Sequence, residues 1–314
     1  MSDAREALTA VRSEVGRVIV GQEGVVSGLI TALLAGGHVL LEGVPGVAKT
    51  LTVKALSASL SLQTRRVQFT PDLMPSDVTG QLVLSSDGHA LTFRRGPVFT
   101  NLLLADEINR TPPRTQAALL EAMEERQVSA EGTAHPLPRP FIVVATQNPV
   151  EYEGTYPLPE AQLDRFLFKL VVGYPDAAQE SEVLARHDAG LDPHDLSAVT
   201  AVADAEVVEA ARREVRDVHA ESHVRDYIVA LARATREAPS VALGVSPRGA
   251  AMLLHAAKAW AWLSGREFVT PDEVKAIAKP TLRHRVALRP EVELEGATAD
   301  GVLDRVLATV PVPR

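Results

Sequence analysis

The 314-residue sequence contains no cysteine and has few aromatic residues. The absence of cysteine excludes disulfides, thiolate catalysis and cysteine-based zinc sites, and it is typical of a reducing compartment. Aromatic residues make up only 4% of the chain, whereas Ala and Val are abundant, which favours helix-rich packing over an aromatic-lined groove. None of its nine histidines has metal-ligand spacing. His219 and His223 are four residues apart, but Ala220 stands where an H-E-x-x-H zinc site has its Glu.

The charge pattern argues against nucleic-acid or membrane binding. A net charge of −8 repels polyanions. Short basic clusters lie at 65–66, 94–95 and 283–285, and we predict that each is a solvated face. The N-terminus carries acidic residues and no apolar core, unlike a signal peptide. Residues 25–41 hold no formal charge, but Gly36-Gly37-His38 divides them, which indicates a buried helix and then a buried strand. We therefore expect a cytoplasmic protein without a membrane span.

Two segments together predict a site for nucleoside-triphosphate hydrolysis. Residues 43–50 read Gly-Val-Pro-Gly-Val-Ala-Lys-Thr and follow an apolar run. They offer backbone N–H groups, a lysine and a hydroxyl, which a polyphosphate and its metal require. Asp106 and Glu107 follow the apolar run 102–105, fifty-six residues beyond Thr50. At the end of a buried strand, one carboxylate can hold Mg²⁺ and the other can polarise a water.

The first segment departs from the usual phosphate-loop pattern at Ala48. The pattern G-x-x-x-x-G-K-[ST] has Gly at this position. Because a Cβ atom penalises positive φ, we expect Ala48 to have helical dihedrals, with flexibility supplied by Gly43 and Gly46. The alternative is a strand–turn–helix link in which Gly and Pro merely punctuate a turn. A dinucleotide fingerprint is excluded, since no G-x-G-x-x-G occurs.

The order of apolar runs predicts a parallel sheet covered by helices on both faces. We expect strands at 38–42, 66–69, 101–105, 140–146 and 165–172, and helices at 4–17, 22–35, 50–60 and 112–126. Two β-hairpins are expected near 82–93 and 127–137. Beyond residue 175 the strand patterns stop and helices broken by Pro and Gly follow, so a domain change is placed there.

Three further residues have a functional and a structural interpretation. Asn148 follows the strand at 140–146, where it could orient a water or contact a γ-phosphate, or simply form an Asn-Pro turn. Arg165 could stabilise the transition state of phosphoryl transfer, or form a salt bridge with Asp164 or Glu160. Arg248 is in the first turn of a predicted helix, where the helix dipole favours anions. Either Arg248 faces an anion, or solvent and salt screen its repulsion from the dipole.

Several distinct sequence blocks are distributed along the chain. They lie at 20–22 (Val-Gly-Gln), 43–50, 95–99 (Arg-Gly-Pro-Val-Phe), 104–110 (Leu-Ala-Asp-Glu-Ile-Asn-Arg), 116–123 (Gln-Ala-Ala-Leu-Leu-Glu-Ala-Met), 145–149 (Ala-Thr-Gln-Asn-Pro), 154–166 and 246–248 (Ser-Pro-Arg). With these blocks the chain resembles the MoxR family of AAA+ ATPases over essentially its whole length. Ala48 is the one departure among these motifs, and it resembles a substitution that the family tolerates.

The resemblance implies a role for each site residue. Lys49 would contact the β- and γ-phosphates of ATP, while Thr50 and Asp106 would hold Mg²⁺. Glu107 would activate water. The remaining residues would be a first sensor (Asn148), an arginine finger acting on ATP of a neighbouring subunit (Arg165), a second sensor in the lid (Arg248), an adenine-pocket segment (Val20 and Gly21) and further ATP-binding positions (Gly43, Val44, Pro45, Gly46, Val47, Ala48 and Leu51).

The resemblance also implies an assembly. Residues 1–175 would form the AAA+ nucleotide-binding α/β domain, and 176–314 a helical lid domain with linker helices. Subunits would form a hexameric ring with both hairpins towards its pore, and the protein would remodel other proteins in a chaperone-like role, often with a von Willebrand factor A partner. Three alternatives stay open: an ATPase acting on nucleic acid, a nucleotide-gated switch with negligible turnover, and a metal-chelatase subunit.

Overall fold

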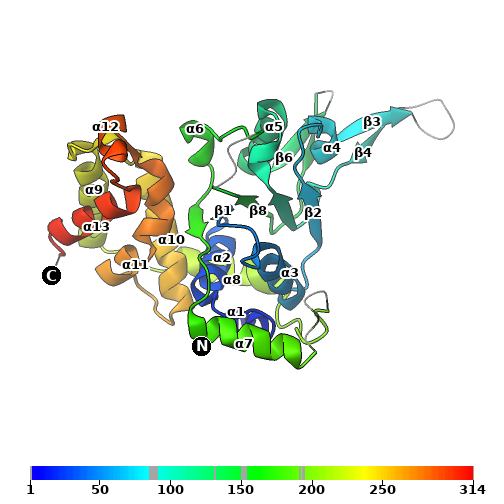
Figure 1. Cartoon of the computed structure of the whole chain (residues 1–314), viewed down its shortest axis with the longest axis horizontal. Helices are drawn as coiled ribbons and strands as arrows, with labels where there is room; N and C mark the ends of the chain where they lie inside the picture. Colours follow the sequence, from blue (N-terminus) through cyan, green and yellow to red (C-terminus); the bar gives the residue numbers. More distant parts are fainter. Residues whose placement is uncertain are drawn as a thin grey trace.

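A parallel sheet lies at the centre of the molecule (Figure 1). Its strand order is β2-β5-β8-β1-β9. A computed structural model describes residues 2–84, 91–130, 132–149, 154–190, 192 and 195–313. The five strands are β1 (Val39–Glu42), β2 (Thr64–Gln68), β5 (Leu102–Asp106), β8 (Ile142–Gln147) and β9 (Phe168–Val171). Every neighbouring pair is parallel. The predicted fold class is confirmed.

Each central strand buries alternate residues on opposite faces of the sheet. Val39 and Leu41 of β1 join one apolar cluster, whereas Leu40 joins the other. The first cluster includes residues of helices α1 (Asp3–Gly16), α2 (Glu23–Ala35) and α3 (Lys49–Ser59), and the second includes residues of α4 (Pro75–Thr79) and α5 (Pro113–Glu125). Burial on both faces explains why these strands read as continuous apolar runs.

Both predicted hairpins are present. The first joins β3 (Gly80–Leu84) to β4 (Leu91–Arg95) and extends away from the sheet (Figure 1). The second joins β6 (Gln127–Ala130) to β7 (Thr133–Pro136). Residues 85–90 and 131, which include the predicted turns, lie outside the described residues. These insertions leave the strand order of the central sheet undisturbed.

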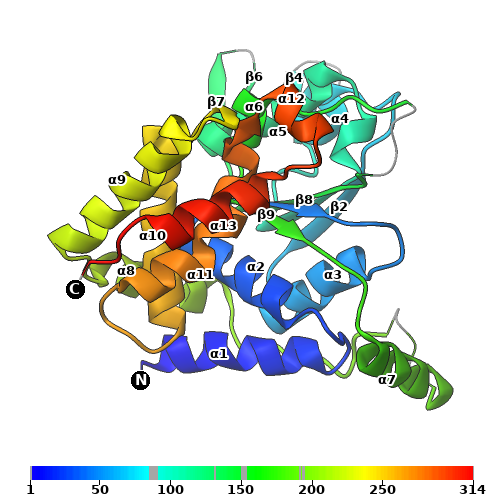
Figure 2. The ribbon, with the colours of Figure 1, turned by 60° about the vertical axis from the view of Figure 1, so that its left-hand side comes forward.

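After α6 (Glu160–Leu163) and β9, the chain is mainly helical. The helices are α7 (Ala177–Asp188), α8 (Ala205–Asp217), α9 (Ser222–Glu237), α10 (Pro247–Leu263), α11 (Pro271–Leu282), α12 (Pro290–Leu294) and α13 (Ala299–Thr309). Figure 2 shows α9, α10, α11 and α13 gathered beside the sheet, with α1 running below α2. A short antiparallel pair, β10 (Val241–Leu243) with β11 (Ala287–Leu288), was not predicted, because such short strands have no readable periodicity.

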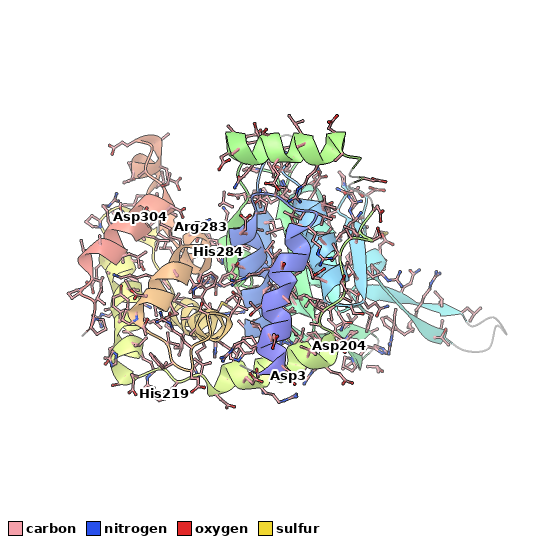
Figure 3. All side chains as sticks on the ribbon, turned by 90° about the horizontal axis from the view of Figure 1, so that it is seen from below. Asp3, Asp204, His219, Arg283, His284 and Asp304 are labelled. Carbon is pink, nitrogen blue, oxygen red and sulfur yellow. The ribbon has the colours of Figure 1, made fainter. Side chains whose placement is uncertain are left out.

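The C-terminal helices are joined to the sheet through a buried ion pair. Arg285 donates from Nε to Asp164 Oδ1 at 2.7 Å, and Nε2 of His284 lies 2.9 Å from the carbonyl oxygen of Phe166. Figure 3 shows Arg283 and His284 between the C-terminal helices and the sheet. The prediction that 283–285 is a solvated face is therefore wrong. Burial lowers the pKa of Arg285 to about 10, which the Asp164 carboxylate opposes.

The uncharged stretch 25–41 divides as predicted into most of α2 and the start of β1, separated by Gly36, Gly37 and His38. No helix within the described residues is long and apolar enough to cross a membrane. The core on the α1–α3 side continues through residues of α8, α10 and α13, so it extends past residue 175. The boundary placed at residue 175 remains a prediction about domains.

His38 fixes the edge of the sheet where the central strands begin. Its Nδ1 accepts the N–H of Val143 at 2.9 Å, and its Nε2 lies 3.2 Å from the carbonyl oxygen of Met123. This pairing requires the neutral ring with the proton on Nε2. Burial, and to a lesser degree Arg126 and Arg212, lower the pKa of His38 from 6.5 to about 4.

Because unfolded His38 binds a proton at higher pH than folded His38, the chain should lose stability as pH falls through the window between 6.5 and about 4. Urea unfolding of wild type should show a loss of about 1 kcal/mol from this group between pH 7.5 and 5.5. His38→Gln should lack that part of the pH dependence, whereas the exposed control His223→Gln should retain it. Equal pH dependence in His38→Gln and wild type would contradict this assignment.

Candidate active site

A cavity of about 580 Å³ lies at the edge of the sheet where β1, β5 and β8 end. It gathers side chains from segments far apart in the sequence. The residues predicted for the site that line it are Val20, Pro45, Gly46, Val47, Ala48, Lys49, Thr50, Leu51, Asp106, Glu107 and Asn148. Gly21, Gly43 and Val44 do not line the cavity, although Gly21 and Val44 adjoin lining residues in the chain. The parallel sheet therefore brings the two predicted halves of the site together.

The loop between β1 and α3 has a tightly constrained backbone. Gly46 has φ +85°, a left-handed value that favours glycine. A Cβ at Gly43 would lie 2.5 Å from the carbonyl oxygen of Val172, so only glycine allows this close approach to the chain after β9. Lys49 Nζ donates to the carbonyl of Val44 at 2.9 Å and also to that of Gly43. The ammonium thus lies within the loop that a polyphosphate would contact.

Ala48 does not have the helical dihedrals expected from the sequence. It has φ 58° and ψ 21°, in the left-handed region, and forms the N-cap of α3. An L-residue pays about 1–2 kcal/mol for this conformation. The chain must turn here to enter α3, and the glycine of the usual pattern meets the same geometric demand. The strained backbone of Ala48 is held by the surrounding structure, as is common at functional sites.

Asp106 ends β5 and is 7% exposed. Its Oδ1 accepts a hydrogen bond from Thr146 Oγ1 of β8 at 2.5 Å, and its Oδ2 accepts one from Thr50 Oγ1 of α3 at 3.3 Å. The Thr146 hydroxyl also accepts the N–H of Glu107 at 2.9 Å. Thr146 therefore orients both acidic residues, a role that sequence reasoning missed.

Glu107 is held at the cavity by two neighbours. Its Oε2 accepts a hydrogen bond from Gln68 Nε2 at 2.7 Å and lies 3.3 Å from Arg110 Nε. Its backbone is left-handed, with φ 58°. Gln68 is the last residue of β2 and is paired with Asp106, the end of β5. Gln68 lies one residue before the end of the predicted strand 66–69, and this position was the sequence signal that could have identified it.

Arg66 is the principal residue that sequence reasoning assigned wrongly. Its side chain is 48% exposed, but its Nη2 and Nε lie 2.8 and 3.1 Å from Asp106 Oδ2, so it lines the site and is not merely a solvated residue. Arg66 is paired with Leu104 across the sheet, two residues before Asp106, which places its long side chain within reach of the carboxylate. The guanidinium therefore offsets the charge of Asp106.

The donor set suits Mg²⁺. The Thr50 hydroxyl and an Asp106 carboxylate oxygen lie 3.3 Å apart, and Mg²⁺ prefers such oxygen ligands while keeping several waters. Among the described residues no group of three or more His, Cys, Asp or Glu could hold a metal ion. A metal with few protein ligands, completed by water and phosphate, fits this site. Arg66 shares Asp106 Oδ2 and would have to yield that oxygen to a metal.

Further lining comes from the end of β8, from α7 and from the segment before α2. Asn148 follows β8 and is 6% exposed. Val183, Arg186 and His187 of α7 also line the cavity, and the sequence did not predict them. Arg186 Nη1 donates to the carbonyls of Gly16 and Arg17 at 3.1 and 2.9 Å. These bonds hold α7 against the end of α1, beside the predicted adenine segment.

Arg165 and Arg248 lie together outside this cavity. Arg165 Nε is 3.0 Å from Glu124 Oε2, and Arg248 Nη1 is 3.0 Å from Glu124 Oε1. Glu124 belongs to α5, and neither Asp164 nor Glu160, the predicted partners, forms a salt bridge with Arg165 among the described residues. The chain thus carries its lysine, hydroxyl and carboxylates in one place and these two arginines in another.

Comparison with known proteins identifies the family. Residues 38–168 match the model of the ATPase family associated with various cellular activities (AAA), and residues 233–306 match the AAA lid domain. Chaperone MoxR1 of Mycobacterium tuberculosis is 41% identical over 314 residues, covering 96% of this chain and 81% of that protein. The chain belongs to the MoxR family of AAA+ ATPases.

Two further comparisons extend over nearly the whole MoxR-family chain. The uncharacterized protein YeaC of Bacillus subtilis is 47% identical over 311 residues, covering 99% of this chain and 96% of that protein. A crystal structure of a Cytophaga hutchinsonii protein assigned as an ATPase superposes with a TM-score of 0.90 at 40% identity, covering 99% and 96% of the two chains. This MoxR-family protein is therefore an ATPase with an AAA domain and an AAA lid domain.

Proposed function

We propose that this MoxR-family ATPase hydrolyses Mg²⁺-bound ATP at sites completed between subunits of a ring. The observation that carries the proposal is the separation of Arg165 and Arg248 from the cavity that holds Lys49, Asp106 and Glu107. Phosphoryl transfer needs cations around the transferring group, and an arginine supplied by another subunit is a known solution. A second copy of this chain would supply these cations.

The cavity residues have the chemistry for their proposed roles. Lys49 contacts the β- and γ-phosphates, and the N–H groups at the start of α3 contribute to the same anion site. Glu107 accepts the proton of the attacking water, held in place by Gln68. Thr50 and Asp106 would hold Mg²⁺, which when bound neutralises charge on the phosphates. Asn148 orients the water or contacts the γ-phosphate.

The proposed client is a protein rather than a nucleic acid. MoxR1, a relative along nearly the whole chain, is named a chaperone. The net charge of −8 gives the chain as a whole no electrostatic attraction for a polyanion. A hexameric ring with the hairpins β3–β4 and β6–β7 towards its pore, acting with a von Willebrand factor A protein, is the form of this role that the family resemblance favours.

The assignment of the base predicts that Glu107→Gln abolishes most turnover but retains ATP binding. Loss of a general base typically lowers the rate by about 10²–10⁴, because the attacking water keeps its proton. Steady-state phosphate release and equilibrium binding of a fluorescent ATP analogue measure the two quantities. Glu125→Gln, on the exposed end of α5, is the matched control and should hydrolyse ATP as wild type does. Unchanged turnover in Glu107→Gln would contradict the assignment of Glu107 as the general base.

The shared-site proposal predicts that subunits with Arg165→Ala poison a mixed assembly. The rate per subunit of wild type should rise with protein concentration, and added mutant subunits should lower it, because each mutant deprives a neighbour of its cation. The pure variant should lose about 10³–10⁵ in rate. Arg233→Ala, a change at an exposed arginine of α9, is the control and should not poison. A wild-type rate independent of both concentration and mutant subunits would rule out a shared site.

A further inference from the structure

A second cavity, of about 560 Å³, lies at the opposite edge of the sheet from the nucleotide cavity. Residues 34–36 of its lining lie shortly before β1, and residues 136–139 and 141 lie shortly before β8. Arg126 at the end of α5, together with residues of α8 and α10, supplies the rest. No residue of this lining also lines the nucleotide cavity, and Arg165 and Arg248 do not belong to it. The second cavity is therefore separate from the nucleotide cavity of its own chain, although Arg126 also lines the small cavity that holds Arg165 and Arg248.

The lining of the second cavity is strongly cationic. It holds one carboxylate, Glu209, against five cations: Arg126, Arg139, Arg212, Arg216 and Lys258. The chain as a whole has a net charge of −8, so this concentration of positive charge runs against the composition. A concave site lined by one sign of charge focuses the electric field and raises the local concentration of ions of the opposite sign.

Arg212 is the buried centre of this cluster. It is 8% exposed; its Nε donates to the carbonyl of Leu33 at 2.8 Å and its Nη1 to Glu209 Oε1 at 2.7 Å. Its Nη2 is buried and has no hydrogen-bond partner in the described part of the chain. Burial lowers the pKa of Arg212, although Glu209 opposes the shift. A buried donor without an acceptor is unfavourable, and an anion in the cavity would supply the acceptor.

The other cations of the cavity are not neutralised by carboxylates. Arg126 Nη2 donates to the carbonyl of Gly36 at 3.1 Å, and Lys258 Nζ to the carbonyl of Arg216 at 3.0 Å. Across the described ranges, no salt bridge joins Arg126, Arg139, Arg216 or Lys258 to an acidic residue; the sole such pair in the lining is Arg212 with Glu209. Most of the positive charge therefore remains available to a ligand.

We propose that this second cavity binds a multiply charged phosphate anion. Guanidinium groups match phosphate oxygens with paired hydrogen bonds, and four of the five cations are arginines. The volume of about 560 Å³ lies within the range of small-molecule sites and exceeds what a single halide needs. Inorganic pyrophosphate and the diphosphate of a nucleotide present the same chemistry, and the experiment distinguishes them.

The test measures pyrophosphate binding by isothermal titration calorimetry, at low ionic strength, to the full chain carrying Lys49→Ala. That change removes the phosphate-binding ammonium of the nucleotide cavity. In this background Arg212→Gln and Arg139→Glu should each weaken pyrophosphate binding about tenfold or more. Arg213→Gln, an exposed neighbour on α8 that does not line the cavity, should leave the affinity unchanged.

Arg139 is exposed, so its substitution tests the charge of the cavity even if Arg212→Gln disturbs folding; circular dichroism reports on the fold of each variant. ADP that binds more tightly than pyrophosphate, with the same loss in Arg139→Glu, would identify a nucleotide as the ligand. Equal affinities would identify the phosphates alone. Absence of pyrophosphate binding to the Lys49→Ala chain, or equal binding with and without Arg139→Glu, would overturn the proposal.

Discussion

The buried carboxylate of Asp106 is the point on which the arrangement of the active site depends. It accepts hydrogen bonds from Thr146 of β8, Thr50 of α3 and Arg66 of β2, so three elements meet at one group. They can meet because β2, β5 and β8 are adjacent parallel strands whose carboxyl ends share an edge of the sheet. A buried carboxylate with these partners is stable, whereas one without them would be costly.

Much of the fold follows from local sequence. Continuous apolar runs predicted the sheet, and the phosphate-loop and Asp106–Glu107 motifs predicted which strand ends form the cavity. What the sequence could not predict depends on long-range geometry. The left-handed backbone of Ala48 comes from the turn into α3, and the bond from Arg66 to Asp106 comes from strand register. The ion pair of Arg165 with Glu124 depends on how α5 and the segment between α6 and β9 are placed in space, which no local pattern encodes.

The charged side chains form two groups at opposite edges of the sheet. Carboxylates, Lys49, Arg66 and Arg186 lie at the edge where the central strands end, and a larger group of arginines lies near the edge where they begin. Glu124 holds Arg165 and Arg248 in the single chain, and under the shared-site proposal a nucleotide phosphate of a neighbouring copy would compete with Glu124 for both. Arg126 lines both the small cavity beside this group and the proposed anion site, which places the two cationic regions side by side.

A crystal structure of the chain with Mg²⁺ and a non-hydrolysable ATP analogue tests the central claim most directly. The account predicts that the triphosphate lies against Lys49 and the N-terminus of α3, with the metal about 2.0–2.1 Å from Thr50 Oγ1. It also predicts that Arg66 leaves the oxygen of Asp106 that it now occupies. A nucleotide bound elsewhere, or a metal held without Thr50 and Asp106, would contradict the account.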